Sequence, residues 1–150
     1  SSDLARHSVN TADHTYVSKY STTSNQRSWA FIYRGASATD ILEMLRSSSG
    51  STTTSPVQSA AHTPTVGTWY HQAMCRNGSN HRAFSNGTQT GSTNTTAVTL
   101  FDSSAGLRVG VIDSAGLTLY MNGYLSEMRI TKAARYTSNF TAPSAAFPRG

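Results

Sequence analysis

The stretch from residue 68 to residue 87 constrains the fold more than any other part of the sequence. Residues 69–76 show the two-residue period of a β-strand. The set of side chains that we expect to face the core is Trp69, His71, Ala73 and Cys75. Asn77-Gly78 and Asn86-Gly87 then bracket residues 81–85, and Asn-Gly supplies the positive φ angles of two-residue hairpin turns. The stretch therefore predicts a meander of short antiparallel strands.

The rest of the chain repeats this design, with short runs of β-branched and aromatic residues between turn residues. Ser, Thr, Gly and Asn are abundant and favour turns and strands over helix interiors. The spacing of the runs predicts an all-β chain, built as an antiparallel β-sandwich or jelly roll. The expected strands cover residues 14–20, 28–34, 40–47, 51–58, 68–76, 81–86, 97–101, 106–112 and 120–131.

Strict alternation breaks in the last expected strand. Met128 and Ile130 share one phase, whereas Leu125 falls in the other. Either Leu125 lies in solvent, or a β-bulge near Ser126 and Glu127 turns all three apolar side chains inward. We expect the bulge.

The segment that follows, residues 136–148, is too rich in Thr, Ser and Pro for a regular element. We expect it to wrap the sandwich, because aromatic side chains are its main apolar material. Its anchors would be Tyr136, Phe140 and Phe147.

Length and cysteine content limit the class of protein. A chain of 150 residues with 37% hydrophobic content fits one domain with a modest core. No stretch approaches the roughly 20 apolar residues of a membrane-spanning helix, so no membrane insertion is expected. The single cysteine, Cys75, cannot form an internal disulfide and excludes Cys-rich zinc patterns. Packing must therefore supply the stability.

The net charge of +5 comes from 12 basic and 7 acidic residues, and charged residues make up only 13% of the chain. A nucleic-acid interface usually clusters Lys and Arg on one element with aromatic residues between them. Here the basic residues are spread along the chain, so a nucleic-acid partner is not expected.

Three blocks resemble the concanavalin A-like or laminin-G-like jelly roll in the form carried by phage virion and tail proteins. The first is VSKY at residues 17–20 with QRSW at 26–29, and the second is GTWYHQA at 67–73 with RAFSNG at 82–87. The third, NGYLSEMRITK at 122–132, looks like the ending of phage tail-associated members. The resemblance implies a concanavalin A-like β-sandwich.

The opening half of that family has no clear counterpart in this chain. We therefore expect residues 14–150 to form the sandwich and residues 1–13 to be an N-terminal extension or interface segment. The short start implies a trimmed sandwich, a fragment of a larger virion protein, or a sheet edge that a neighbouring subunit completes. An exposed edge invites pairing with another chain. We accordingly expect a homo-oligomer with contacts to other virion chains.

An enzyme is not expected, although the fold family includes glycoside hydrolases. Retaining hydrolysis needs two carboxylates at a set separation. No expected strand carries two on one face, because Asp40 and Glu43 are three residues apart. Metal-protease and serine-hydrolase motifs are absent. His71 is interpreted as a core or interface histidine.

Two kinds of binding site remain as hypotheses. Asp102 and Asp113 flank residues 107–110 and could supply oxygen ligands to Ca²⁺, although capping of turns is the more common role of Asp. No other cofactor is expected. For glycan binding, aromatic faces beside polar groups are required, and the candidates are Trp29, Tyr33, Tyr70 and Tyr120.

The resemblance leads to two functional hypotheses. The first is a non-enzymatic virion structural, decoration or tail module that acts through protein–protein contacts and is located in the phage particle. The second is a carbohydrate-binding adhesion module that recognises a host surface glycan. Fold alone does not choose between them.

Overall fold

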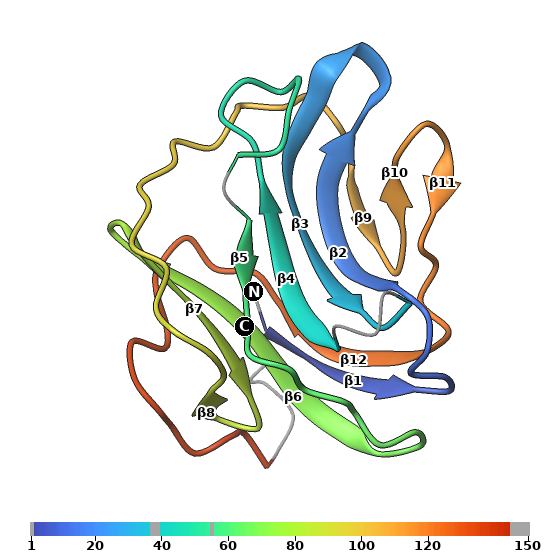
Figure 1. Cartoon of the computed structure of the whole chain (residues 1–150), viewed down its shortest axis with the longest axis vertical. Coiled ribbons are helices and arrows are strands. Elements are labelled where there is room, and N and C mark those ends of the chain that lie inside the picture. Colours follow the sequence, from blue (N-terminus) through green and yellow to red (C-terminus); the bar gives the residue numbers. More distant parts are fainter. Residues whose placement is uncertain (1, 37–39, 55, 145–150) are drawn as a thin grey trace.

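The chain folds into two facing β-sheets, as a computed structural model shows for residues 2–36, 40–54 and 56–144 (Figure 1). The first sheet has the strand order β12-β1-β6-β7-β8. Its strands are β1 (Ser2–His7), β6 (Trp69–Asn77), β7 (Asn80–Ser85), β8 (Thr88–Gln89) and β12 (Gly123–Arg129). The predicted all-β sandwich is confirmed.

The second sheet has the order β11-β10-β2-β3-β4-β5, and β9 also pairs with β2. Its strands are β2 (His14–Ser21), β3 (Gln26–Arg34), β4 (Ile41–Arg46), β5 (Val57–Gln58), β9 (Leu107–Val109), β10 (Ile112–Asp113) and β11 (Leu117–Thr118). A 3-10 turn, η1 (Thr23–Asn25), joins β2 to β3. The described residues contain no helix that could span a membrane.

Strand β1 is the main correction to the sequence analysis, which predicted no strand before residue 14. It lies between β12 and β6 and forms antiparallel pairs with both, so this segment is an inner strand of the first sheet. Its sequence, SDLARH, shows no clear apolar alternation, because the side chains that it buries are the small Ala5 and the polar His7. Residues 97–101 form no strand, and the expected strand at 51–58 is reduced to β5.

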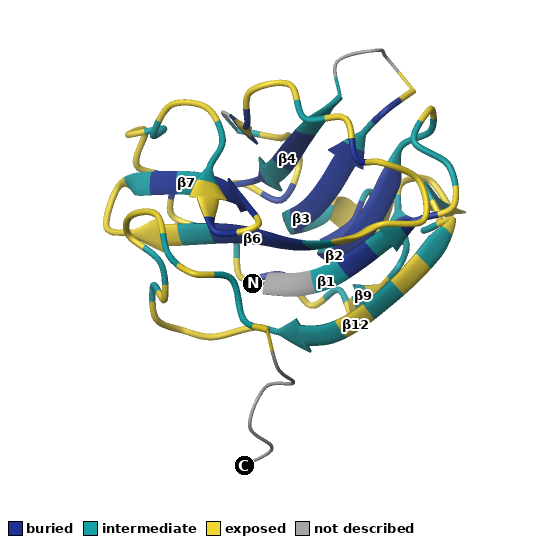
Figure 2. Cartoon of the chain, turned by 90° about the horizontal axis from the view of Figure 1, so that it is seen from below, coloured by how far each residue is buried: buried dark blue, intermediate teal, exposed yellow. Residues whose placement is uncertain are grey.

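The core between the sheets contains side chains from both of them, among them Tyr16, Phe31, Leu42 and Met74. A second buried cluster joins Ala30 and Ile32 of β3, which alternate with the first set, to Tyr20 of β2 and Ile112 of β10. The second sheet is therefore apolar on both faces. The inner strands β2 and β3 are largely buried and β6 is buried at its middle, whereas edge strand β12 is half-buried or exposed (Figure 2).

The prediction that Trp69, His71, Ala73 and Cys75 of β6 face the core between the sheets is wrong. Met74, from the opposite set, packs in the core between the sheets, and Trp69 is 42% exposed. His71 and Ala73 are buried on the outer face instead. The reason is that the C-terminal tail covers this face, so that both faces of β6 are buried at its middle.

Tyr136 and Phe140 anchor this tail, as predicted, while Phe147 lies outside the described residues. Their rings stack with centroids 3.5 Å apart and meet Phe84 edge-on at 6.2 and 5.4 Å. The Phe140 amide also donates to the Gly87 carbonyl oxygen over 2.9 Å. Aromatic contacts and backbone pairing together dock the tail on the first sheet.

The predicted bulge in β12 is confirmed. Ser2 pairs with Arg129 and Leu4 pairs with Ser126, so β12 has one residue more than β1 between these pairs. Glu127 absorbs it with a φ of 52°. Leu125 and Met128 both pack against the main core, whereas Ile130 is 45% exposed, so its inward placement is wrong.

The Asn86-Gly87 hairpin is confirmed, with φ angles of 48° and 82°. Gly87→Ala is expected to destabilise the chain by about 3 kcal/mol, because the new Cβ would collide with the Phe140 carbonyl oxygen at an already unfavourable φ. Gly78→Ala is the matched control, since Gly78 has a φ of 61° but open space around it. Urea unfolding should show a loss of only about 1 kcal/mol for the control. Equal losses would contradict the collision.

Candidate ligand-binding cavity

A cavity of about 370 Å³ lies where the two sheets meet the chain that follows β12. Its apolar lining comes from both sheets and includes Trp29, Phe31, Met44 and Met74. Trp29 and Phe31 project from the inner face of β3, where Phe31 lies opposite Met44 of β4. Cys75, Arg76 and Leu100 also line it, and residues 129–133, 135 and 136 complete the wall, which ends at the tail anchor Tyr136. Its volume lies in the range of small-molecule sites, roughly 300–1,000 Å³.

Four cationic side chains line this cavity, and we call it the basic cavity. They are Arg76, Arg129, Lys132 and Arg135, and none of the described lining residues is acidic. Arg76, Lys132 and Arg135 are exposed, so their charged ends can reach a ligand from the rim. The cavity thus combines an apolar interior with positive charge at its mouth.

A further arginine, Arg46, is fully buried next to Trp29, its cross-strand neighbour. Arg46 Nη1 lies 3.0 Å from His81 Nε2 and donates to the Thr96 carbonyl oxygen over 3.1 Å. Burial, and then the charge of Arg76, lowers the pKa of Arg46. The charge of Arg76 on the cavity rim therefore repels the charge of buried Arg46.

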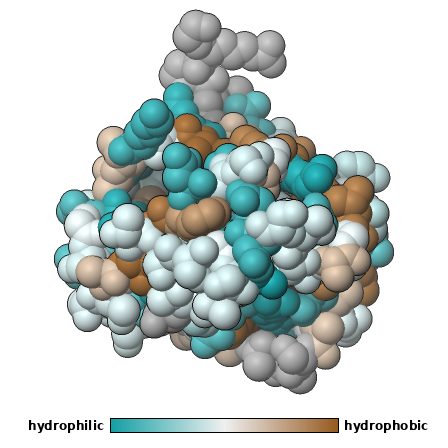
Figure 3. Space-filling model, turned by 90° about the horizontal axis from the view of Figure 1, so that it is seen from above, coloured by the Kyte–Doolittle hydropathy of each residue, from teal (hydrophilic) through white to brown (hydrophobic). Residues whose placement is uncertain are grey.

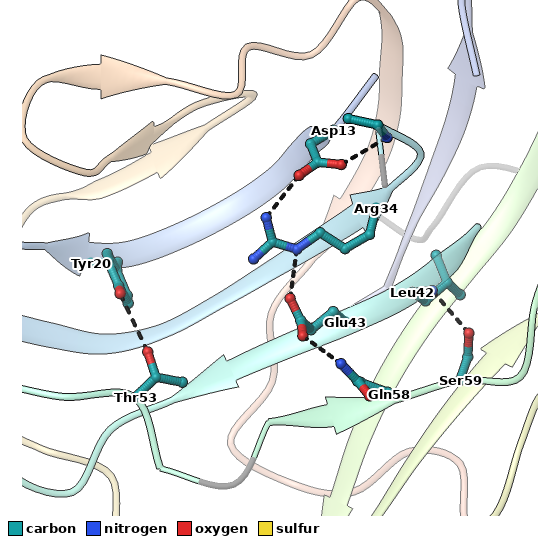
Figure 4. A network of polar contacts seen from close by, with 9 residues as sticks. Asp13, Tyr20, Arg34, Leu42, Glu43, Thr53, Gln58 and Ser59 are labelled. Carbon is teal, nitrogen blue, oxygen red and sulfur yellow. Dashed lines mark hydrogen bonds and ion pairs between the residues drawn. The ribbon is translucent and has the colours of Figure 1, made fainter. Parts of the chain in front are cut away.

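The carboxylates of the second sheet are held elsewhere in ion pairs. Arg34 Nη1 donates to Asp13 Oδ2 over 2.9 Å, and its Nε donates to Glu43 Oε2 over 2.6 Å (Figure 4). Gln58 completes the network by donating to Glu43 Oε1 over 2.8 Å. The Arg34 guanidinium thus binds both carboxylates, and we interpret this network as stabilising the second sheet.

The four predicted glycan contacts are not brought together. Trp29 lines the basic cavity, but Tyr33 is fully buried, with its hydroxyl 2.7 Å from Asp40 Oδ1. Burial, and then this hydrogen bond, raises the pKa of Tyr33. Tyr33 is therefore a core residue, and its prediction as a glycan contact is wrong. The Tyr70 hydroxyl accepts a hydrogen bond from the Thr65 amide, and Tyr120 is 60% exposed outside the cavity lining.

The predicted calcium ligands do not form a cluster either. Asp113 forms an ion pair with Arg108 over 3.5 Å and accepts a hydrogen bond from the Gly116 amide at 3.4 Å, as a turn-capping Asp does. Asp102 is exposed. Within the described ranges no group of three or more His, Cys, Asp or Glu side chains is placed to hold a metal ion.

A row of three side chains on the outer face of the first sheet was missed by the sequence analysis. Arg6 pairs across strands with both Trp69 and Tyr124, and its guanidinium lies 5.5 and 4.4 Å from their ring centroids. Cation–π attraction of this kind orients the rings. The pairing could be found only after β1 had been recognised as a strand.

Histidines form a polar cluster inside the fold, away from the basic cavity. His7 Nε2 lies 2.9 Å from the Tyr16 hydroxyl, and the His7 ring meets those of His14 and Tyr33 edge-on. Burial, followed by the nearby His14, lowers the pKa of His7 to about 4. His71 is buried against the tail, as a core histidine, but neither of its ring nitrogens has a hydrogen-bond partner within the described part of the chain.

Two facing sheets around a shared core define the chain as a β-sandwich. The family model of the concanavalin A-like lectin/glucanases superfamily matches residues 4–139, and the chain belongs to this superfamily. The match includes β1 from Leu4 onward. Comparison with curated proteins and with solved structures gives no match. Membership indicates a carbohydrate-binding or protein-interaction module, and the superfamily contains both lectins and enzymes.

Proposed function

We propose that this chain is a non-catalytic carbohydrate-binding module whose site is the basic cavity. The observation that carries the proposal is the joint placement of Trp29 and Tyr136 in a cavity that also presents several hydrogen-bond donors. Sugars bind to aromatic faces through their C–H groups and to cationic or amide donors through their hydroxyls. Ligand sites typically combine such an apolar lining with a few polar groups.

The non-catalytic part of the proposal is supported by the composition of the cavity. Glycoside hydrolysis needs a pair of carboxylates flanking the scissile bond. No carboxylate lines the described wall of the cavity, and Asp13 and Glu43 are bound by Arg34. The site can therefore hold and orient a sugar but lacks the acid and nucleophile of that reaction.

The two tryptophans of the chain allow a matched test. Trp69→Phe leaves Trp29 as the single tryptophan, so its fluorescence should report glycan binding at the cavity. Trp29→Ala is expected to weaken glycan binding at least roughly tenfold, because stacking on the ring is lost. Trp69→Ala, on the outer face, should leave the affinity unchanged. A glycan array that shows no binding, or loss of binding only with Trp69→Ala, would overturn the cavity as the site.

We also propose a second function, as a structural or decoration module of a phage virion. The resemblance of residues 122–143 to phage tail-associated proteins supports it. So does a set of large exposed hydrophobic residues on the edge formed by β9, β11 and the loop after them: Leu107, Val109, Leu117 and Tyr120, which are 47–60% exposed. Seen from above, by contrast, the surface carries separate hydrophobic groups among hydrophilic ones (Figure 3).

This edge would be the contact between copies or with other virion chains. Light scattering on the purified chain should give a defined oligomer, and Val109→Lys should shift it to monomer without loss of folding. Ser114→Lys, at an exposed position in the turn between β10 and β11, is the control. A monomer at all concentrations would count against self-association through this edge.

A further inference from the structure

Charge distinguishes the basic cavity from an ordinary sugar-binding groove. Neutral sugars are usually held by both donors and acceptors, and carboxylate side chains supply the acceptors for sugar hydroxyls. Here the described lining residues contribute four cations and no carboxylate. Their polar side chains are thus mainly donors, which matches a ligand with strong acceptors.

The surroundings of the cavity strengthen its positive field. Fully buried Arg46 lies beside Trp29 and adds a charge that solvent does not screen directly. The carboxylates of Asp13, Glu43 and Asp113 lie in ion pairs with other arginines. Burial, and then the charge of Arg76, lowers the pKa of Arg46, and an anion in the cavity would offset the repulsion between these two arginines.

We propose that the basic cavity selects an acidic sugar, one whose ring packs on Trp29 and Tyr136 while its carboxylate or sulfate group binds the rim cations. The inference rests on the proposed carbohydrate-binding function and specifies its ligand class. Guanidinium groups match both anions through paired N–H donors, and charge-assisted hydrogen bonds of this kind are about twice as strong as neutral ones. A volume of about 370 Å³ suits a terminal sugar more than an extended chain.

The test is an array of glycans in pairs that differ only in the anion. Glucuronate is compared with glucose, a 6-sulfated glucoside with its parent glucoside, and sialylated with unsialylated lactose. The acidic member of a pair should bind and the neutral member should bind at least roughly tenfold more weakly. The affinity should fall as NaCl rises from about 0.05 to about 0.5 M, because exposed charges are screened. Comparing carboxylate with sulfate pairs identifies which anion is preferred.

Single charge removals locate the anion. Lys132→Gln and Arg135→Gln, both at exposed positions, should each weaken binding of the acidic glycan roughly two- to fivefold. Arg108→Gln on β9 removes the same charge outside the cavity and should have no effect. Unfolding curves for all three variants show whether folding is preserved.

The outcomes separate this inference from the proposed function. Equal binding of neutral and acidic members would overturn acidic selectivity while leaving carbohydrate binding intact. Acidic binding that both cavity variants retain in full would overturn the cavity as the anion site. Binding of polyglutamate as tight as that of acidic glycans would overturn the requirement for a sugar. No binding to any glycan would overturn both proposals.

Discussion

Phe84→Ala is expected to lower the free energy of unfolding by about 3–5 kcal/mol, the range for removing a buried aromatic side chain. Phe84 is fully buried and contacts both tail anchors, Tyr136 and Phe140, through edge-on rings. Its loss removes core volume and also the surface on which the tail docks. Because Tyr136 ends the wall of the basic cavity, glycan binding should fall together with stability. Urea unfolding followed by circular dichroism measures the first effect and a glycan titration the second.

Phe84→Leu is the matched control, since it keeps most of the apolar volume and should cost less than about 1.5 kcal/mol. It should also retain the cavity. If the alanine and leucine variants lost the same stability, the volume beneath the tail would not be what stabilises this face of the sheet.

Acidification is expected to destabilise the fold by about 3 kcal/mol through His7 alone. The pKa of His7 is about 4 in the folded chain and about 6.5 when unfolded, so below pH 6.5 the unfolded state binds the proton more readily. The stability that neutral His7 contributes is therefore fully present above pH 6.5 and is lost as the pH falls from 6.5 toward 4. Burial also lowers the pKa values of His62, His71 and His81, which adds to the loss in the same direction.

The measurement is the free energy of urea unfolding at pH 7, 6, 5 and 4 for the natural chain and for His7→Phe. Phenylalanine cannot bond to Tyr16, so the variant should be less stable at pH 7. Its stability should nevertheless change less with pH, because one buried titrating group is gone. The same slope in both proteins would show that His7 does not titrate on unfolding.

Local sequence patterns predicted those turns and strands whose conformation is determined by neighbouring residues in the sequence. The Asn86-Gly87 turn follows from the dihedral angles that a two-residue hairpin requires, and the β12 bulge follows from the phase of Leu125 and Met128. Strand β1 could not be found in this way. Its position depends on backbone pairing with β6 and β12, which its side chains do not reveal.

The candidate site was only partly predictable for a similar reason. Trp29 was identified as an aromatic candidate, but the basic residues looked dispersed because they are far apart in the sequence. Arg76 and Arg129 come to the same cavity because β6 and β12 flank the same inner strand, β1. The clustering of charges across a sheet depends on the order of its strands, and a pattern of neighbouring residues in the sequence does not reveal that order.

The position of β1 also sets the order in which the chain can fold during synthesis. Its residues leave the ribosome before those of either partner strand, because β6 begins at Trp69 and β12 begins at Gly123. Closing such long loops is slow, because the entropy of the intervening chain is lost before the pairing stabilises it. The first sheet can therefore be completed only after β12 has been made. Until then β1 lacks at least one partner strand, and its unpaired edge is open to pairing with another nascent chain.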